Sequence, residues 1–247
     1  MSAVAHRPRI IFFTGLGCDE RMVAPHYPIN ADIEFQPWLD PIGGESLVEC
    51  AIRMAQRLDV SRPYYLAGIS LGGMVAQEVA IHLAPRAKPE GLILLSTCRS
   101  ALGVPWTHRI VSRLVAAGPD WFIHFGKTLV PHMRHLFGLM EAKEVELFEG
   151  MMGSAKDASI RWSLQAIAGW KGGGAIDVPT FQVHAERDRV LPLRTAGPVD
   201  VIIEGAGHAM TVTRAAEVNT AVNRWLRERS GATGRGTPRP VAVAGGD

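Results

Sequence analysis

The segment Gly68-Ile69-Ser70-Leu71-Gly72 is the part of the chain whose residue types and spacing most clearly predict chemistry. Glycines two positions before and after the serine permit a turn too sharp for bulky neighbours. The strand-like run YYLA precedes the segment and the helical run MVAQEVAIHL follows it. A serine on such a turn projects its hydroxyl above the strand end, near a helix N-terminus that favours negative charge. We predict that Ser70 is a nucleophile; the alternative is a small-residue turn with an N-capping serine.

His208 is the histidine best placed to activate this serine. A serine hydroxyl is a poor nucleophile unless a neighbouring base accepts its proton. Among the nine histidines, His208 lies in the loop Glu204-Gly205-Ala206-Gly207-His208, between the last predicted strand and the last predicted helix. A loop in that position reaches over the C-terminal edge of a parallel sheet, where Ser70 should point. His184 is the alternative, but it falls at the end of a predicted strand.

Two carboxylates compete for the role of orienting the base. Such an acid holds the imidazole tautomer and stabilises the imidazolium. The fourth predicted strand ends in Ser96-Thr97-Cys98 and offers no carboxylate, whereas the loop after the fifth contains both Glu186 and Asp188. We favour Asp188, which lies deeper in that loop and closer to Pro192, and keep Glu186 as the alternative.

Acyl transfer also needs hydrogen-bond donors for a developing oxyanion, usually the largest electrostatic contribution to catalysis. One predicted donor is the backbone N–H of Leu71, next to the nucleophile. The second is the N–H of Leu16, because Thr14-Gly15-Leu16-Gly17-Cys18 follows the first strand and its glycines let the backbone approach a ligand. The same glycines match a dinucleotide-binding fingerprint poorly, because Glu20 occupies the third glycine position.

Neither the other histidines nor the cysteines form a metal or disulfide pattern. His132 and His135 are three residues apart without an apparent third ligand, so packing is the preferred interpretation. Cys18, Cys50 and Cys98 are widely spaced, which fits neither a zinc site nor a disulfide framework. We therefore predict no metal, no cofactor and a reducing compartment.

The segments that must position these residues alternate between strand-like and helix-like patterns. This alternation is typical of a parallel sheet covered by helices on both faces. Strands are predicted at residues 9–14, 33–37, 64–67, 91–96, 180–184 and 200–204. Helices are predicted at residues 46–59, 71–83 and 213–229.

Between residues 99 and 175 the alternation stops, and several short helices are predicted instead. We interpret this segment as a helical cap inserted into a core domain formed by residues 1–98 and 176–229. Because the insertion leaves and re-enters at the C-terminal edge of the sheet, Trp121, Phe125 and Trp162 are candidates for the wall of a substrate pocket. A helical cap also needs an apolar core of its own, and this alternative accounts for the three aromatic residues equally well. Residues 230–247, rich in Gly, Pro and Arg, are predicted to form a disordered tail.

The charge balance argues against several kinds of partner. The 26 basic and 24 acidic residues leave a net charge of +2, which indicates neither a nucleic-acid nor a membrane partner. No apolar run reaches the ~18 residues of a membrane span, and the start MSAVAHRPR lacks the apolar region of a secretory signal. We expect a cytoplasmic protein with a small-molecule acyl substrate and leave open whether a protein partner or acyl carrier exists. Arg109 and Arg113, four apart on a predicted helix, are candidates to meet an acidic carrier, although a solvated helix face is preferred.

Together these motifs resemble the α/β-hydrolase superfamily, in particular its small capped serine hydrolases of the carboxylesterase type. The resemblance covers residues 9–229 and includes the chain order Ser70, Asp188, His208. It implies an α/β-hydrolase fold: a mostly parallel sheet of the six predicted strands, flanked by helices and carrying a helical cap. It also implies that Ser70 is the nucleophile, Asp188 the acid, His208 the base, and Leu16 and Leu71 the oxyanion donors.

The chain departs from the family pattern in several places. Thr14 stands where many relatives carry a histidine before the first glycine of the oxyanion loop. The stretch between Asp188 and His208 is short, so the usual helix there should be vestigial, around residues 193–196. The two N-terminal antiparallel strands common in the family are absent from the predicted elements.

The expected activity is hydrolysis of an ester or thioester of a small, largely apolar acyl substrate through an acyl-enzyme on Ser70. A serine at this position, rather than an aspartate, argues against the related dehalogenases and epoxide hydrolases. Two alternatives remain: a carbon–carbon bond hydrolase or lyase using the same residues, and a small-molecule receptor of the same fold with slow turnover.

Overall fold

A computed structural model describes residues 7–172 and 174–233 and contains a six-stranded sheet in the order β2-β1-β3-β4-β5-β6. Every neighbouring pair of strands is parallel. The strands are β1 (Arg9–Phe13), β2 (Asp32–Phe35), β3 (Tyr65–Ile69), β4 (Gly91–Leu95), β5 (Thr180–Ala185) and β6 (Val201–Ile203). The predicted α/β sheet is thereby confirmed.

The register of the strands brings the predicted site loops to one edge of the sheet. Ile69 at the end of β3 pairs with Leu95 at the end of β4, and Leu95 pairs with Val183 of β5. Ala185, the last residue of β5, pairs with Ile203, the last residue of β6. Because the strands are parallel and end together, the loops that follow β3, β5 and β6 emerge side by side.

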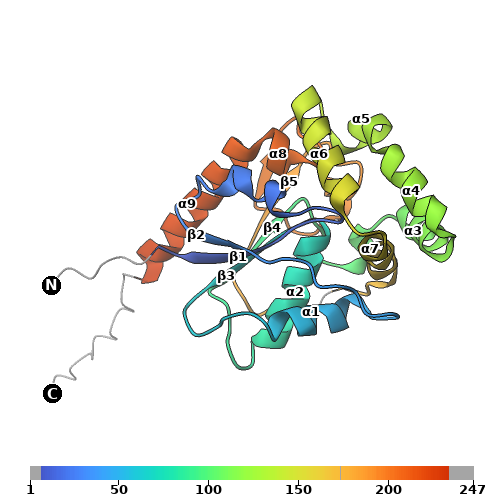
Figure 1. The fold of residues 1–247 in the computed structure, drawn as a ribbon. Helices are drawn as coiled ribbons and strands as arrows, with labels where there is room; N and C mark the ends of the chain where they lie inside the picture. The colour runs from blue at the N-terminus through green and yellow to red at the C-terminus, as the bar shows by residue number, and fades with distance from the viewer. Residues whose placement is uncertain (1–6, 173, 234–247) are drawn as a thin grey trace, which may run out of the picture.

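Side chains alternate between two buried clusters, one on each face of the sheet. Ile10 and Phe12 of β1 join the cluster that contains Val218 and Val222 of α9 (Ala215–Thr233). Ile11 joins the second cluster, which contains residues of α1 (Leu47–Ala55) and α2 (Leu71–Leu83). Figure 1 shows α1 and α2 on one side of the sheet and α9 on the other. Both faces of the sheet are therefore covered, which is why the central strands are apolar throughout.

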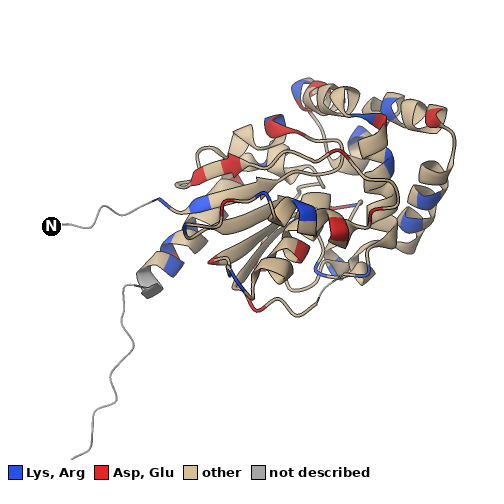
Figure 2. Cartoon of the chain, turned by 60° about the horizontal axis from the view of Figure 1, so that its bottom comes forward, with Lys and Arg blue, Asp and Glu red and all other residues tan. Residues whose placement is uncertain are grey.

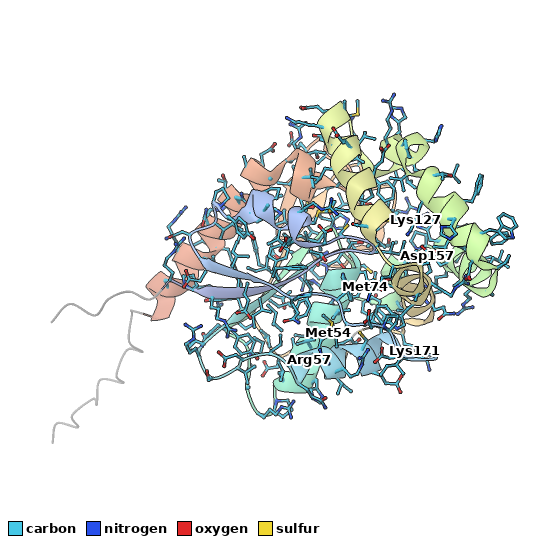
Figure 3. The ribbon with its side chains drawn as sticks, viewed as in Figure 1. Met54, Arg57, Met74, Lys127, Asp157 and Lys171 are labelled. Atoms are coloured by element: carbon cyan, nitrogen blue, oxygen red, sulfur yellow. The ribbon has the colours of Figure 1, made fainter. Side chains whose placement is uncertain are left out.

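Five α-helices connect β4 to β5 and stand beyond the C-terminal edge of the sheet (Figure 1). They are α3 (Trp106–Ala117), α4 (Asp120–Thr128), α5 (Arg134–Phe137), α6 (Ala142–Ser154) and α7 (Asp157–Gly169), with short 3-10 helices η3 (Ala101–Gly103) and η4 (Val130–Met133). Lys127 of α4 and Asp157 of α7 point toward each other in Figure 3 and form an ion pair of 2.6 Å. This pair ties α4 to the helix that leads back to the sheet.

Arg113 is exposed, as a solvated helix face predicts, and both Arg109 and Arg113 also bond to the end of α7. Arg109 donates to the carbonyl oxygens of Ala168 (3.4 Å) and Trp170 (3.2 Å), and Arg113 donates to that of Ala168 (3.3 Å). The last carbonyls of a helix have no intrahelical partner, and cationic side chains stabilise them. The two arginines thus join α3 to α7.

The closing helix continues to Thr233, beyond the predicted end at Arg229, so residues 230–233 are helical rather than part of a disordered tail. Arg229 lies 5.2 Å over the Trp225 ring and donates to the carbonyl oxygen of Glu90, and Ser230 donates to that of Leu226. These contacts favour continuation of the helix. The rest of the predicted tail, residues 234–247, lies outside the described residues.

Charged residues are interspersed over the helices and loops, with both signs present in the view of Figure 2. Within residues 7–172 and 174–233, none of the helices combines the length and the apolar character required to cross a bilayer.

Candidate active site

Ser70 occupies a strained turn between β3 and α2. Its φ of 53° and ψ of −118° place a non-glycine residue at positive φ, a conformation that costs about 1–3 kcal/mol and persists only when the surroundings enforce it. The Ser70 N–H donates to the carbonyl oxygen of Leu95 (3.0 Å), and the Ser70 carbonyl accepts from the Thr97 hydroxyl (2.7 Å). A Cβ on Gly68 would overlap the backbone of Gly72, and one on Gly72 would overlap the end of β1. The flanking glycines are therefore required for this turn.

His208 bridges Ser70 and Asp188. Its Nε2 atom lies 3.1 Å from the Ser70 hydroxyl oxygen, and its Nδ1 atom lies 2.7 Å from Asp188 Oδ2. Because an ionised carboxylate only accepts hydrogen bonds, Nδ1 carries the proton and donates to Asp188. Nε2 is then the acceptor for the Ser70 hydroxyl, which is the arrangement a general base requires.

The surroundings of Asp188 keep its carboxylate ionised. Oδ1 accepts from the N–H groups of Val190 (2.8 Å) and Leu191 (2.8 Å), while Oδ2 accepts from His208. Burial works toward raising the pKa of Asp188, but its electrostatic interaction with His208 and the hydrogen bonds from His208 and Leu191 together hold that pKa below its ordinary value.

Glu186, the alternative acid, has a different partner. Its side chain is exposed, and Oε2 accepts from the N–H of Gly205 (2.8 Å), which lies in the loop before His208. Of the two carboxylates, the structure brings Asp188 to His208. Between Asp188 and β6 the chain forms only the short 3-10 helix η5 (Leu193–Thr195), in line with the vestigial helix expected there.

The loop after β1 lies directly against Ser70. A Cβ added to Gly15 would lie 3.6 Å from the Ser70 Cβ. The turn is closed by the Cys18 N–H, which donates to the Gly15 carbonyl (3.2 Å), and by the Thr14 hydroxyl, which donates to the Cys18 carbonyl (3.0 Å). On the other side, Leu71 is the first residue of α2, where backbone N–H groups lack intrahelical partners. The two segments that carry the predicted oxyanion donors thus flank the serine.

The three aromatic residues predicted to form a pocket wall are not gathered into one. Trp121 and Phe125 of α4 are 60% and 57% exposed, so they do not enclose a cavity. Trp162 is 6% exposed, its indole N–H donates to the Glu45 carbonyl (3.0 Å), and its ring packs on Trp38. Trp162 therefore belongs to the packed interior, in agreement with the alternative interpretation, whereas Trp121 and Phe125 lie mostly in solvent.

Two other residues of the inserted helices approach the site instead. The Phe137 ring at the end of α5 lies 6.2 Å from that of His208, and its carbonyl accepts from the Ala209 N–H (2.8 Å). Met152 of α6 covers Gly17, since a Cβ on Gly17 would overlap its sulfur. No sequence signal identified them, because α5 is only four residues long and Met152 is one of nine methionines.

His132 and His135 line a separate cavity, whereas Cys18 lies in the loop beside Ser70. Across the described ranges 7–172 and 174–233, no cluster of three His, Cys, Asp or Glu side chains is arranged to hold a metal ion. A cavity of 670 Å³ between η4 and α6 is lined partly by His132, His135 and Glu149 and contains none of the predicted catalytic residues. Cys18, Cys50 and Cys98 are buried, which raises the pKa of each thiol to about 12.

Comparisons with known proteins agree with this architecture. A sequence model described as "Alpha/beta hydrolase family" matches residues 2–221, and no curated protein matches the chain. A thermophilic esterase from Thermogutta terrifontis is similar in structure, with TM-score 0.69, 19% identity, and 91% of each chain covered. An enol-lactonase from Burkholderia xenovorans LB400 is similar with TM-score 0.68 and 16% identity over 92% of this chain and 94% of that one. A type II thioesterase of the yersiniabactin biosynthetic pathway is similar with TM-score 0.60 and 16% identity over 93% and 96%.

Proposed function

This chain belongs to the alpha/beta hydrolase family, and we propose that it is a serine hydrolase that cleaves an ester or thioester of a small, largely apolar acyl substrate. The observation that carries the proposal is the hydrogen-bonded chain from Ser70 through His208 to Asp188, with Ser70 on a strained turn. Strain of this kind is retained where it serves the chemistry of a site.

The proposed reaction forms and then hydrolyses an acyl-enzyme. His208 Nε2 takes the Ser70 proton as the serine oxygen bonds to the acyl carbon, and Asp188 stabilises the resulting imidazolium. The tetrahedral oxyanion accepts hydrogen bonds from the N–H groups of Leu16 and Leu71. When the tetrahedral intermediate collapses, the bond from the acyl carbon to the leaving oxygen or sulfur breaks. The alcohol or thiol departs with the proton from His208. Water then gives a proton to His208, attacks the acyl carbon, and releases the acid as the proton returns to Ser70.

The chemistry of the neighbouring side chains supports an apolar acyl group. Phe137 lies beside His208, and Met152 covers the loop that carries Leu16. Both are partly buried and pack against the same apolar cluster. The names of two structural neighbours, an esterase and a thioesterase, agree with an acyl ester or thioester as substrate.

A substrate panel on purified protein tests the proposal. p-Nitrophenyl esters and acyl thioesters of varied chain length would be compared with vinylogous diketones, and Ser70→Ala would be the matched control. We expect many turnovers on esters or thioesters and a loss of about 10³-fold or more in Ser70→Ala, because the three residues act as a unit.

Three other outcomes would contradict the proposal. Turnover of diketones alone would indicate a carbon–carbon bond hydrolase or lyase. Tight binding without multiple turnovers would indicate a receptor. Ester hydrolysis that is unchanged in Ser70→Ala would exclude this serine as the nucleophile.

A further inference from the structure

The proposed mechanism does not use a second histidine, His184, that is buried beside the acid. His184 lies near the end of β5 and is 0% exposed. Its Nε2 atom is 2.8 Å from the Leu191 carbonyl oxygen and 3.5 Å from Asp188 Oδ2. Asp188 Oδ2 is also the oxygen that accepts the hydrogen bond from His208.

Both neighbours of this nitrogen are hydrogen-bond acceptors, so Nε2 carries a proton. A carbonyl and a carboxylate have no hydrogen to give. The proton on Nε2 is donated to Leu191, whose own N–H donates to Asp188 Oδ1 (2.8 Å). The Leu191 backbone is thereby fixed on both sides, by His184 through its carbonyl and by Asp188 through its N–H.

The imidazole at this position is costly to bury. Within the described residues its Nδ1 atom is buried and makes no hydrogen bond of good geometry, although the Thr97 backbone interacts with the ring, and a poorly satisfied buried polar atom costs roughly 1–3 kcal/mol. An apolar side chain in the same space would avoid that cost. The presence of histidine therefore points to a requirement for the Nε2–H group.

We propose that His184 is a positioning residue for the acid–base pair, because its Nε2–H holds the loop that carries Asp188 and the Nε2 atom lies 3.5 Å from the Asp188 oxygen that accepts from His208. This inference rests on the proposed function. If the N–H is removed, the Leu191 carbonyl is left unpaired and buried, the loop relaxes, and Asp188 withdraws from His208. The imidazolium formed during catalysis is then less well stabilised, so kcat falls.

Few charged or titratable groups surround His184. Asp188 faces it from the loop after β5, His208 is near from the loop after β6, and Cys98 lies close to Asp188 from the end of β4. Burial lowers the pKa of His184, and the pKa of Cys98 is raised to about 12.

The test compares His184→Gln, His184→Asn and His184→Leu. The glutamine amide can place an N–H where Nε2 stands, whereas the asparagine amide is shorter and cannot reach Leu191. His132→Leu, on an exposed histidine of η4, is the matched control. The readouts are kcat, KM, the pH profile of kcat/KM, and the downfield NMR resonance of the His208 Nδ1–H.

We expect His184→Leu and His184→Asn to lower kcat by about 10- to 100-fold, as small displacements of catalytic groups do, with KM nearly unchanged. The acidic limb of the profile should move to lower pH and the downfield resonance should shift. His184→Gln and His132→Leu should resemble the wild type. If His184→Leu does not fold, the comparison of the two amides decides the question.

Equal behaviour of His184→Gln and His184→Asn, or a wild-type profile and resonance in His184→Leu, would overturn the inference. Failure of the proposed function is distinguished by a serine-directed phosphonate fluoride. A wild-type chain that is not labelled contradicts the function itself. If the wild type is labelled and His184→Leu and His184→Asn have wild-type kcat and pH profile, only the role of His184 is contradicted.

Discussion

At the scale of single residues, the two oxygens of Asp188 have separate partners. Oδ1 is fixed by the N–H groups of Val190 and Leu191, so it anchors the side chain to its own loop. Oδ2 accepts from His208 and is therefore the oxygen that fixes the tautomer of the base. Glu186 instead joins its loop to the backbone of Gly205.

Because Asp188 bonds to His208 and Glu186 bonds to Gly205, conservative substitutions of the two acids should have different effects. Asp188→Asn should lower kcat by about 10⁴-fold, because an amide can favour the wrong tautomer of the histidine. Glu186→Gln should have little effect, since the amide oxygen can still accept from the Gly205 N–H. Steady-state kinetics on an aryl ester would compare them, and a larger loss in Glu186→Gln would mean that Asp188 is not the acid.

Residue types and local order predict that Ser70, His208 and Asp188 lie together, because each lies in the segment that follows a strand of one parallel sheet. The same reasoning treated His184 as a rival base. Its actual position, with Nε2 bonded to Leu191 and near Asp188, depends on how the loop folds back after β5. A linear pattern does not contain that information.

At the scale of helices and strands, the apolar runs located the strands of the sheet better than they located the strand ends. β1 and β4 are buried at every position, and their apolar runs marked them within a residue of their observed ends. The predicted limits of β6 are also within a residue, whereas those of β3 and of β2, an edge strand with exposed positions, differ from the observed ends by up to two residues. An edge strand presents a weaker apolar pattern because part of it faces solvent.

For the helices between β4 and β5, an amphipathic pattern does not predict which surface each helix packs against. The pattern identified apolar faces but not the surface that each face meets. Trp121 and Phe125 are exposed, Trp162 is buried, and Phe137 and Met152 are the side chains found beside His208 and Gly17.

This arrangement predicts unequal contributions of the tryptophans to stability. Trp162→Ala should lower the free energy of unfolding by about 3–5 kcal/mol, because it removes a buried ring. Trp121→Ala should change it by no more than about 0.5 kcal/mol, because most of that side chain is already in solvent. Urea unfolding measures both, and equal losses would contradict the observed placement of these helices.

At the scale of the whole molecule, the two apolar clusters on the faces of the sheet contain all three cysteines. Cys18 belongs to one cluster, and Cys50 and Cys98 belong to the other. Burial prevents access to the sulfurs, and the raised pKa of about 12 keeps each as a thiol at ordinary pH. Thiolates, not thiols, react with alkylating reagents.

The native protein should therefore resist iodoacetamide at pH 8, with no loss of activity. In urea, the three thiols should become reactive together with the loss of helical circular dichroism, because their protection comes from the folded core. Rapid modification of any of them in the native protein would show that the core opens locally at that position.

The central claim, that Ser70 is a nucleophile activated by His208 and Asp188, is tested most directly by covalent trapping. A serine-directed phosphonate fluoride forms a stable bond only with an activated serine, and intact mass spectrometry followed by peptide mapping locates it. We predict one label per wild-type chain, located on Ser70, and no label on a folded Ser70→Ala variant. A label that persists in Ser70→Ala, or an unlabelled wild type that still hydrolyses esters, would contradict the account.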